Sequence, residues 1–214
     1  MIKLYDYALS VNCYKPRLLM SLLDVDYESV PVDFFPGEEH KGAAFRKINP
    51  LGHLPVLIDG DFVLRDAHAI LLYLAAKHDR SGRWYPTADP ELIGQVAQWM
   101  LFAEGTTATA SAARLHDNLG YGFDIDEVRQ GAHRLFRVLD EHLWFAERDG
   151  RDWVCSPPHP TVADLAIFPD VMLSEEGGIS RLDYPALRRW TDRVRRLERF
   201  TPMPGIQPVG APFP

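Results

Sequence analysis

The fold is decided by residues 49–70, which read NPLGHLPVLIDGDFVLRDAHAI. Two short apolar runs, 56–58 and 62–64, flank an Asp-Gly turn, and an Asp-Gly pair between such runs strongly indicates a β-hairpin. Asp66 follows the second run and opens a helix that we expect to extend to about His78. The stretch therefore predicts a hairpin followed by a helix.

Strand and helix patterns alternate upstream of this unit. Residues 2–5 and 27–32 are predicted strands, and residues 17–23 and 41–47 are predicted helices. The elements therefore follow the order βαβ-α-ββα. This order predicts an α/β domain in which helices pack on a mixed four-stranded sheet.

The composition changes downstream of the unit. Residues 80–89 are rich in turn formers and carry no apolar periodicity, so we expect a linker there between a first domain, 1–79, and a second domain, 90–214. Apolar residues then recur at helical spacing, which predicts an all-helical second domain. A hydroxyl-x-x-carboxylate box at 161–164 is expected to start one of its helices. The proline-rich tail, 201–214, is expected to be extended.

Charge and cysteine content exclude several classes of protein. The 214 residues include 23 basic and 30 acidic side chains, a net charge of -7, whereas a nucleic-acid-binding surface needs the opposite balance. Two cysteines, Cys13 and Cys155, and scattered histidines predict neither a disulfide framework nor a metal site. No apolar run is long enough to span a bilayer, and the first residues do not resemble a signal peptide. We therefore expect a cytoplasmic protein that contacts neither nucleic acid nor membrane.

A second motif, LYDYALSVNCYKPR at residues 4–17, places Ser10 between a strand and a helix. In their order and spacing, this motif, residues 49–70 and the capping box resemble the cytosolic glutathione transferases, particularly the bacterial and theta-like branch that uses serine. The resemblance covers nearly the whole chain. It implies a thioredoxin-like first domain that binds glutathione as co-substrate, and a helical second domain that completes the substrate pocket.

Ser10 has the chemistry that activation of glutathione requires. Lowering a thiol pKa by about two units from 8.5 needs roughly 2.7 kcal/mol of preferential thiolate stabilisation. A hydrogen bond to a charged group supplies about 1.5–3 kcal/mol, and a helix N-terminus adds roughly 0.3–1 kcal/mol. A serine at a helix start is therefore sufficient, although it can also be a plain helix cap. Asn12 is a rival donor to the thiolate, or an assistant to Ser10, and it too can be a cap.

The resemblance also implies where the rest of glutathione binds. Six positions are expected to form the glutathione site: Lys41, His53, Leu54, Pro55, Asp66 and Ala67. Lys41 and His53 would face the glycine carboxylate, and Leu54 would precede a cis proline. Asp66 and Ala67 would hold the glutamyl end. The chain departs from its relatives at Ala67, where a serine is usual, and at Pro16, where a valine is usual.

The predicted activity is conjugation of glutathione to a small hydrophobic electrophile, or thiol-dependent reduction. Leu9, Trp99, Phe102 and Thr106 are the expected electrophile pocket. A non-catalytic ligand-binding or interaction protein of the same fold is one alternative. A thiol-disulfide redox protein that works through Cys13 is another. We also expect a homodimer, because the helix that begins at Pro90 carries more apolar positions than one buried stripe requires.

Overall fold

A four-stranded mixed sheet forms the centre of the first domain in the computed structural model, which describes residues 1–210. The strands are β1 (Ile2–Asp6), β2 (Tyr27–Pro31), β3 (Val56–Asp59) and β4 (Phe62–Arg65), and their order in the sheet is β2-β1-β3-β4. β1 is parallel to β2 and antiparallel to β3, and β3 and β4 form the predicted hairpin. The expected mixed four-stranded sheet is confirmed.

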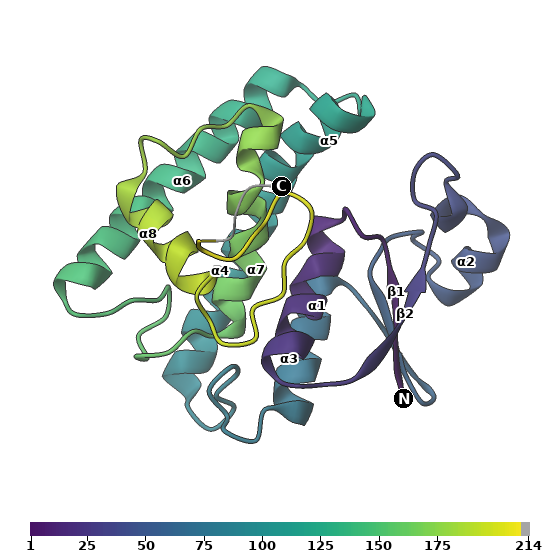
Figure 1. Cartoon of the computed structure of the whole chain (residues 1–214), viewed down its shortest axis with the longest axis horizontal. Helices are drawn as coiled ribbons and strands as arrows, with labels where there is room; N and C mark the ends of the chain where they lie inside the picture. Colours follow the sequence, from purple (N-terminus) through teal and green to yellow (C-terminus); the bar gives the residue numbers. More distant parts are fainter. Residues whose placement is uncertain (211–214) are drawn as a thin grey trace.

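Three helices cover the two faces of this sheet. They are α1 (Val11–Leu22), α2 (Ala43–Ile48) and α3 (Ala67–His78). Figure 1 shows α1 and α3 together on the face that meets the second domain, with α2 on the opposite side. Pro16 is buried within α1, and the helix continues past it to its end. The departure at Pro16 therefore leaves the helix in place.

The second domain is helical, as predicted. α4 (Pro90–Thr106) passes directly into η2 (Thr107–Ser111), a π-helical turn, and then into α5 (Ala112–Leu119). The chain continues through α6 (Ile125–Arg148), α7 (Val162–Met172), the short η3 (Ser174–Gly177) and α8 (Pro185–Val194). π-helical turns often mark functional positions, and this one faces the cavity described below.

α7 connects the two domains. All of its residues are buried, and it packs against α1, α3 and α4. The predicted capping box is confirmed, because Thr161 and Asp164 bond reciprocally to each other's backbone. Asp164 also accepts a hydrogen bond from the indole of Trp190 at 2.9 Å, which fixes α8 to the start of α7.

The C-terminal segment returns to the first domain. The Tyr14 hydroxyl donates to the carbonyl of Thr201 at 2.6 Å. Residues 201–210 contain no helix, as expected, and the last four residues of the predicted tail lie outside the described part. Within residues 1–210, no helix combines the length and apolar character needed to cross a membrane.

Candidate functional site

A cavity of about 1200 Å³ lies between the two domains. From the first domain it is lined by the loop between β1 and α1, parts of the segment 34–54, and the start of α3. From the second domain it is lined by η2, α5 and the loop that follows α5. Ligand sites commonly form at such domain boundaries.

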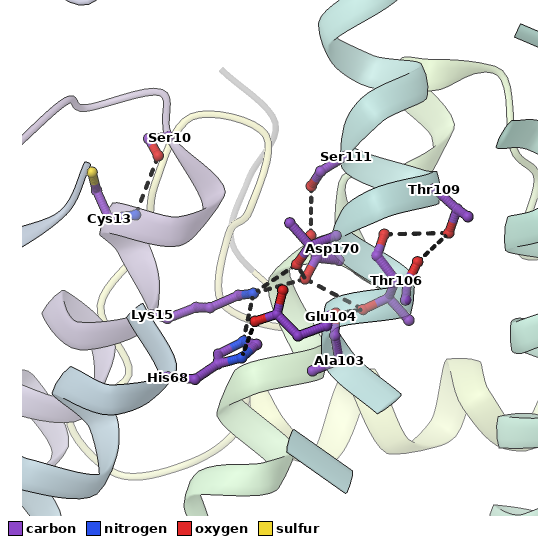
Figure 2. Close-up of polar contacts among 12 residues, drawn as sticks. Ser10, Cys13, Lys15, His68, Ala103, Glu104, Thr106, Thr109, Ser111 and Asp170 are labelled. Atoms are coloured by element: carbon purple, nitrogen blue, oxygen red, sulfur yellow. Dashed lines mark hydrogen bonds and ion pairs between the residues drawn. The ribbon is translucent and has the colours of Figure 1, made fainter. Parts of the chain in front are cut away.

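Ser10 lies on this cavity and caps α1. Its Oγ accepts a hydrogen bond from the backbone N–H of Cys13 at 3.2 Å (Figure 2). Since the oxygen is the acceptor there, the hydroxyl proton remains available for an acceptor in the cavity. Asn12 also lines the cavity, and its side chain makes no hydrogen bond within residues 1–210. Ser10, and not Asn12, is therefore the helix cap, while both remain candidate donors.

Cys13 is enclosed behind this surface. Its side chain is fully buried, and burial raises the pKa of its thiol to about 12, with the Asp6 carboxylate adding to the effect. A thiol of this kind is protonated at neutral pH and inaccessible to a disulfide partner. Burial and protonation of this thiol therefore argue against the alternative of a redox protein that works through Cys13.

Basic residues gather where the glycine end of glutathione was expected. Lys41, His53 and Leu54 all line the cavity, together with two neighbours that the sequence pattern did not indicate, His40 and Arg46. His40 stacks on Phe34 with 4.1 Å between ring centroids, and its buried Nδ1 has no partner within residues 1–210. Burial lowers the pKa of His40, so the ring is neutral. This wall suits a carboxylate.

Pro55 supports the wall without lining it. The Leu54–Pro55 bond is cis, as the family resemblance implies, and Pro55 is buried behind Leu54. The cavity therefore meets Leu54, and the structure does not bring Pro55 into direct reach of a ligand.

The start of α3 forms another part of the cavity. Asp66 has a φ of 77°, which is unusual for a residue other than glycine. Its Oδ1 accepts from the N–H groups of His68 and Ala69 at 2.9 and 3.0 Å. The N–H of Ala67 has no acceptor within residues 1–210. A helix N-terminus that borders a cavity and has a free N–H can receive the carboxylate of a ligand.

Three of the four residues predicted for the electrophile pocket lie elsewhere. Leu9 lines the cavity, but Trp99, Phe102 and Thr106 do not. Trp99 packs against Phe102 and His142, with ring centroids 5.1 and 4.5 Å apart. Thr106 is buried, and its hydroxyl donates to the carbonyl of Ala103. The prediction for these three is wrong, because their face of α4 turns towards its own domain.

The residues of the second domain that line the cavity follow α4 in the chain and begin at Thr107. η2, α5 and the following loop supply apolar side chains, three small polar ones and one cation: Thr107, Ala108, Ser111, Ala112, Arg114, Leu115, Asn118, Leu119, Tyr121 and Phe123. Leu9 lines the same cavity. Sequence periodicity does not reveal these residues of the second domain, since the π-helical turn shifts the face that the helix presents.

A buried polar cluster lies directly behind this wall. Lys15 and Asp170 are both fully buried, with Nζ and Oδ2 2.9 Å apart (Figure 2). Lys15 also donates to Thr107 Oγ1 at 3.2 Å, and the Ser111 hydroxyl donates to Asp170 Oδ1 at 2.5 Å. Thr107 and Ser111 therefore belong both to the cavity wall and to the buried cluster.

His68 completes the cluster on the side of the first domain. Its Nε2 lies 3.2 Å from Lys15 Nζ, and its Nδ1 lies 2.8 Å from Glu104 Oε1. Burial and the Lys15 ammonium lower the pKa of His68 to about 4. The neutral ring therefore accepts from Lys15 and donates to Glu104. Asp66, His68 and Glu104 bring potential metal ligands within 4.8 Å of one another, but these contacts already engage both nitrogens of His68.

Comparisons with known proteins agree on one family. Residues 4–82 match the family model for the N-terminal domain of glutathione S-transferases. Glutathione S-transferase Z1 of Arabidopsis thaliana is 40% identical, over 97% of this chain and 93% of that protein. Maleylacetoacetate isomerase of Pseudomonas aeruginosa is 26% identical, over 89% of this chain and 90% of that protein. The crystal structure of a glutathione S-transferase from Pseudomonas fluorescens superposes with a TM-score of 0.84 at 28% identity, over 94% of this chain and 98% of that chain.

Proposed function

Because this chain belongs to the glutathione S-transferase family, we propose that it activates glutathione in the cavity between its domains and transfers the thiolate to a small hydrophobic electrophile. The observation that carries this proposal is the state of Ser10. Its hydroxyl lies on the cavity, is oriented by the Cys13 N–H, and keeps its proton free to donate. We also propose that the chain belongs to the branch of the family that uses serine.

The charges around the cavity suggest how the tripeptide lies. The glutamyl carboxylate would bind the free N–H of Ala67, and Asp66 would hold the glutamyl ammonium. The backbone of Leu54 would pair with the cysteinyl unit in strand-like fashion. The glycine carboxylate would lie against Lys41 and His53, with His40 and Arg46 beside them. The thiol then points towards Ser10.

The chain's own groups account for activation of the thiol. Hydrogen bonding by Ser10 and the N-terminus of α1 together stabilise the thiolate by roughly 2–4 kcal/mol, the amount needed to ionise it near neutral pH. The thiolate sulfur then forms a bond to the electrophilic carbon, and the leaving group departs with the bonding electrons. The apolar wall from Ala108 to Phe123 would bury the body of the electrophile.

Glutathione-dependent isomerisation of a double bond is a second candidate, because one relative is named an isomerase. The same thiolate would add to a conjugated double bond, the resulting single bond would rotate, and elimination would release the thiolate unchanged. The two reactions differ in whether glutathione is consumed.

The assembly and its division into domains are also proposals. We place the domain boundary in residues 80–89, between α3 and α4. Most surplus apolar residues of α4 pack within their own chain, but Leu101 remains 75% exposed, and Phe62 and Val63 of the hairpin are about half exposed. A cytoplasmic homodimer would cover such residues. Sedimentation equilibrium at micromolar concentration tests this, and a fully active monomer would contradict it.

Calorimetric titration with reduced glutathione, followed by product analysis, tests the proposed function. We expect saturable binding and formation of a thioether from a chloronitroarene. Isomerisation of a cis double bond without loss of glutathione would select the second candidate. No binding at millimolar glutathione would contradict both and favour a non-catalytic binding protein.

A further inference from the structure

The loop that presents Ser10 is held by a donor at each of three consecutive carbonyls. The N–H of Ser10 itself donates to the carbonyl of Tyr7 at 2.9 Å. Arg17 donates to Ala8 and Arg114 donates to Leu9, each at 3.0 Å. Arg17 belongs to α1 and is paired with Asp6 at the end of β1. Arg114 differs from these donors, since it reaches the loop from the other domain.

Arg114 is itself firmly placed. Its Nε donates to Glu176 Oε2 at 2.5 Å, and its side chain is only 13% exposed. η3 presses against the backbone of α5 at this point, because a Cβ added to Gly177 would lie 2.6 Å from the N atom of Arg114. The guanidinium therefore bridges a carboxylate of the second domain and the carbonyl that directly precedes Ser10.

We propose that Arg114 is a positioning residue for glutathione activation, which holds the Ser10 loop from the helical domain. This inference rests on the proposed function. Arg114 lines the same cavity as Ser10. Fixing the Leu9 carbonyl fixes the peptide that leads into the α1 cap, and with it the direction of the serine hydroxyl. Displacement of a catalytic group by about 1 Å can cost on the order of 100-fold in rate.

The test compares Arg114→Met with Arg193→Met. Arg193 also bridges a carbonyl, that of Asp152, and a carboxylate, that of Glu147, at 3.0 and 2.8 Å, but it does not line the cavity. We expect Arg114→Met to lower kcat/KM for glutathione about 10-fold and to raise the pKa in its pH profile by about one unit. Arg193→Met should leave both unchanged, and it controls for the stability lost when a partly buried arginine bridge is removed.

The variant Arg114→Lys distinguishes the effect of holding the Ser10 loop from the effect of the positive charge at this position. Lysine keeps the positive charge but cannot donate to Leu9 and Glu176 in the same planar arrangement. The proposal therefore predicts that Arg114→Lys resembles Arg114→Met in its pH profile. A wild-type profile for Arg114→Lys would show that charge alone acts, and would overturn the positioning role.

Amide hydrogen exchange of residues 8–12 in the ligand-free protein supplies a readout that needs no glutathione. Exchange should be about 10-fold faster in Arg114→Met than in the wild type or in Arg193→Met, since the loop has lost an anchor. Equal exchange in the two variants would overturn the proposal. A wild type that does not turn over glutathione would refute the proposed function, and the exchange comparison would still decide whether Arg114 holds the loop. Faster exchange without a change in kcat/KM or its pH profile would also overturn the proposal.

Discussion

Two polar clusters are built on consecutive turns of α1. The open cluster, Ser10 and Asn12, faces the cavity with a hydroxyl proton and a side-chain amide that have no acceptor or partner within residues 1–210. The closed cluster, Lys15 of α1, His68 of α3 and Asp170 of α7, lies between the domains and is completed by hydroxyl groups of the helical domain. One turn of helix separates side chains whose hydrogen-bonding groups are available to a ligand from side chains that are paired within the protein.

The difference shows how one helix serves both docking and binding. Burying a charge is expensive unless it is paired and hydrogen-bonded, so the closed cluster requires the two domains to adopt one arrangement. In the open cluster the donors border the cavity, where the proposed glutathione would bind. Thr107 and Ser111 belong to both regions, because they line the cavity and donate to Asp170. The closed cluster thereby fixes the part of the cavity wall that the helical domain contributes.

The largest effect is expected from breaking the closed cluster. Lys15→Met leaves the Asp170 carboxylate buried without its cation, which should lower the free energy of unfolding by about 3–5 kcal/mol. Urea unfolding measures this. Lys3→Met is the matched control, because Lys3 pairs with Glu28 at an exposed site, and it should change stability little.

A double variant sharpens that prediction. Lys15→Met combined with Asp170→Leu removes both charges, so much of the lost stability should return. A single variant as stable as the Lys3 control would show that the cluster does not hold the domains together.

The next effect concerns the open cluster. Ser10→Ala removes one hydrogen bond to the thiolate, so kcat/KM should fall roughly 10- to 150-fold, the equivalent of 1.5–3 kcal/mol. The variant also loses the α1 cap, at a cost of about 1 kcal/mol in stability. Asp89→Ala, which removes the cap of α4 away from the cavity, supplies the control for that cost and should keep full activity. If Asn12→Ala is the more damaging change, the amide and not the serine carries the role.

The pH dependence of stability tests the state of His68. Its pKa is lower in the folded protein, about 4, than in the unfolded chain, about 6.5, so the unfolded state binds more protons between these values. The contribution of His68 to the free energy of unfolding is therefore complete above pH 6.5, and it should fall by about 2 kcal/mol between pH 7 and pH 5. Glu104 opposes part of this change, because burial raises its pKa. His68→Gln should flatten the dependence, and an unchanged slope would mean that His68 is protonated in the folded state.

The smallest effect is expected at Cys13. Its buried, protonated thiol takes no part in the proposed chemistry, so Cys13→Ala should keep conjugation activity within about threefold. In the native protein, a thiol reagent should label Cys13 only as fast as the structure opens. Rapid labelling that glutathione blocks would instead support redox chemistry at this residue.

Local patterns were enough to predict the sheet and much of the cavity. The Asp-Gly hairpin, the Asp66 helix start and the capping box at Thr161 each depend on residues close in sequence, and the structure contains them. The closed cluster could not be predicted in this way, because Lys15 and Asp170 meet only when the domains dock. The sequence around Lys15 also has no periodicity that would distinguish a buried lysine from an exposed one.

The sequence also did not predict which way the side chains of α4 point. Trp99 and Phe102 mark a helical stripe, but spacing alone does not say whether that stripe faces a cavity or another helix. Arg114 was missed because an arginine on an amphipathic helix resembles a solvated one until its partner, the carbonyl of Leu9, is placed beside it.

The ionisation of bound glutathione tests the central claim most directly. The thiolate absorbance of glutathione is followed across pH in the presence of saturating protein. If the open cluster stabilises the thiolate, the bound thiol should titrate about two units below the free value of 8.5, and Ser10→Ala should reverse most of that shift. A bound thiol that titrates at the free value, or a shift that Ser10→Ala leaves intact, would contradict the account.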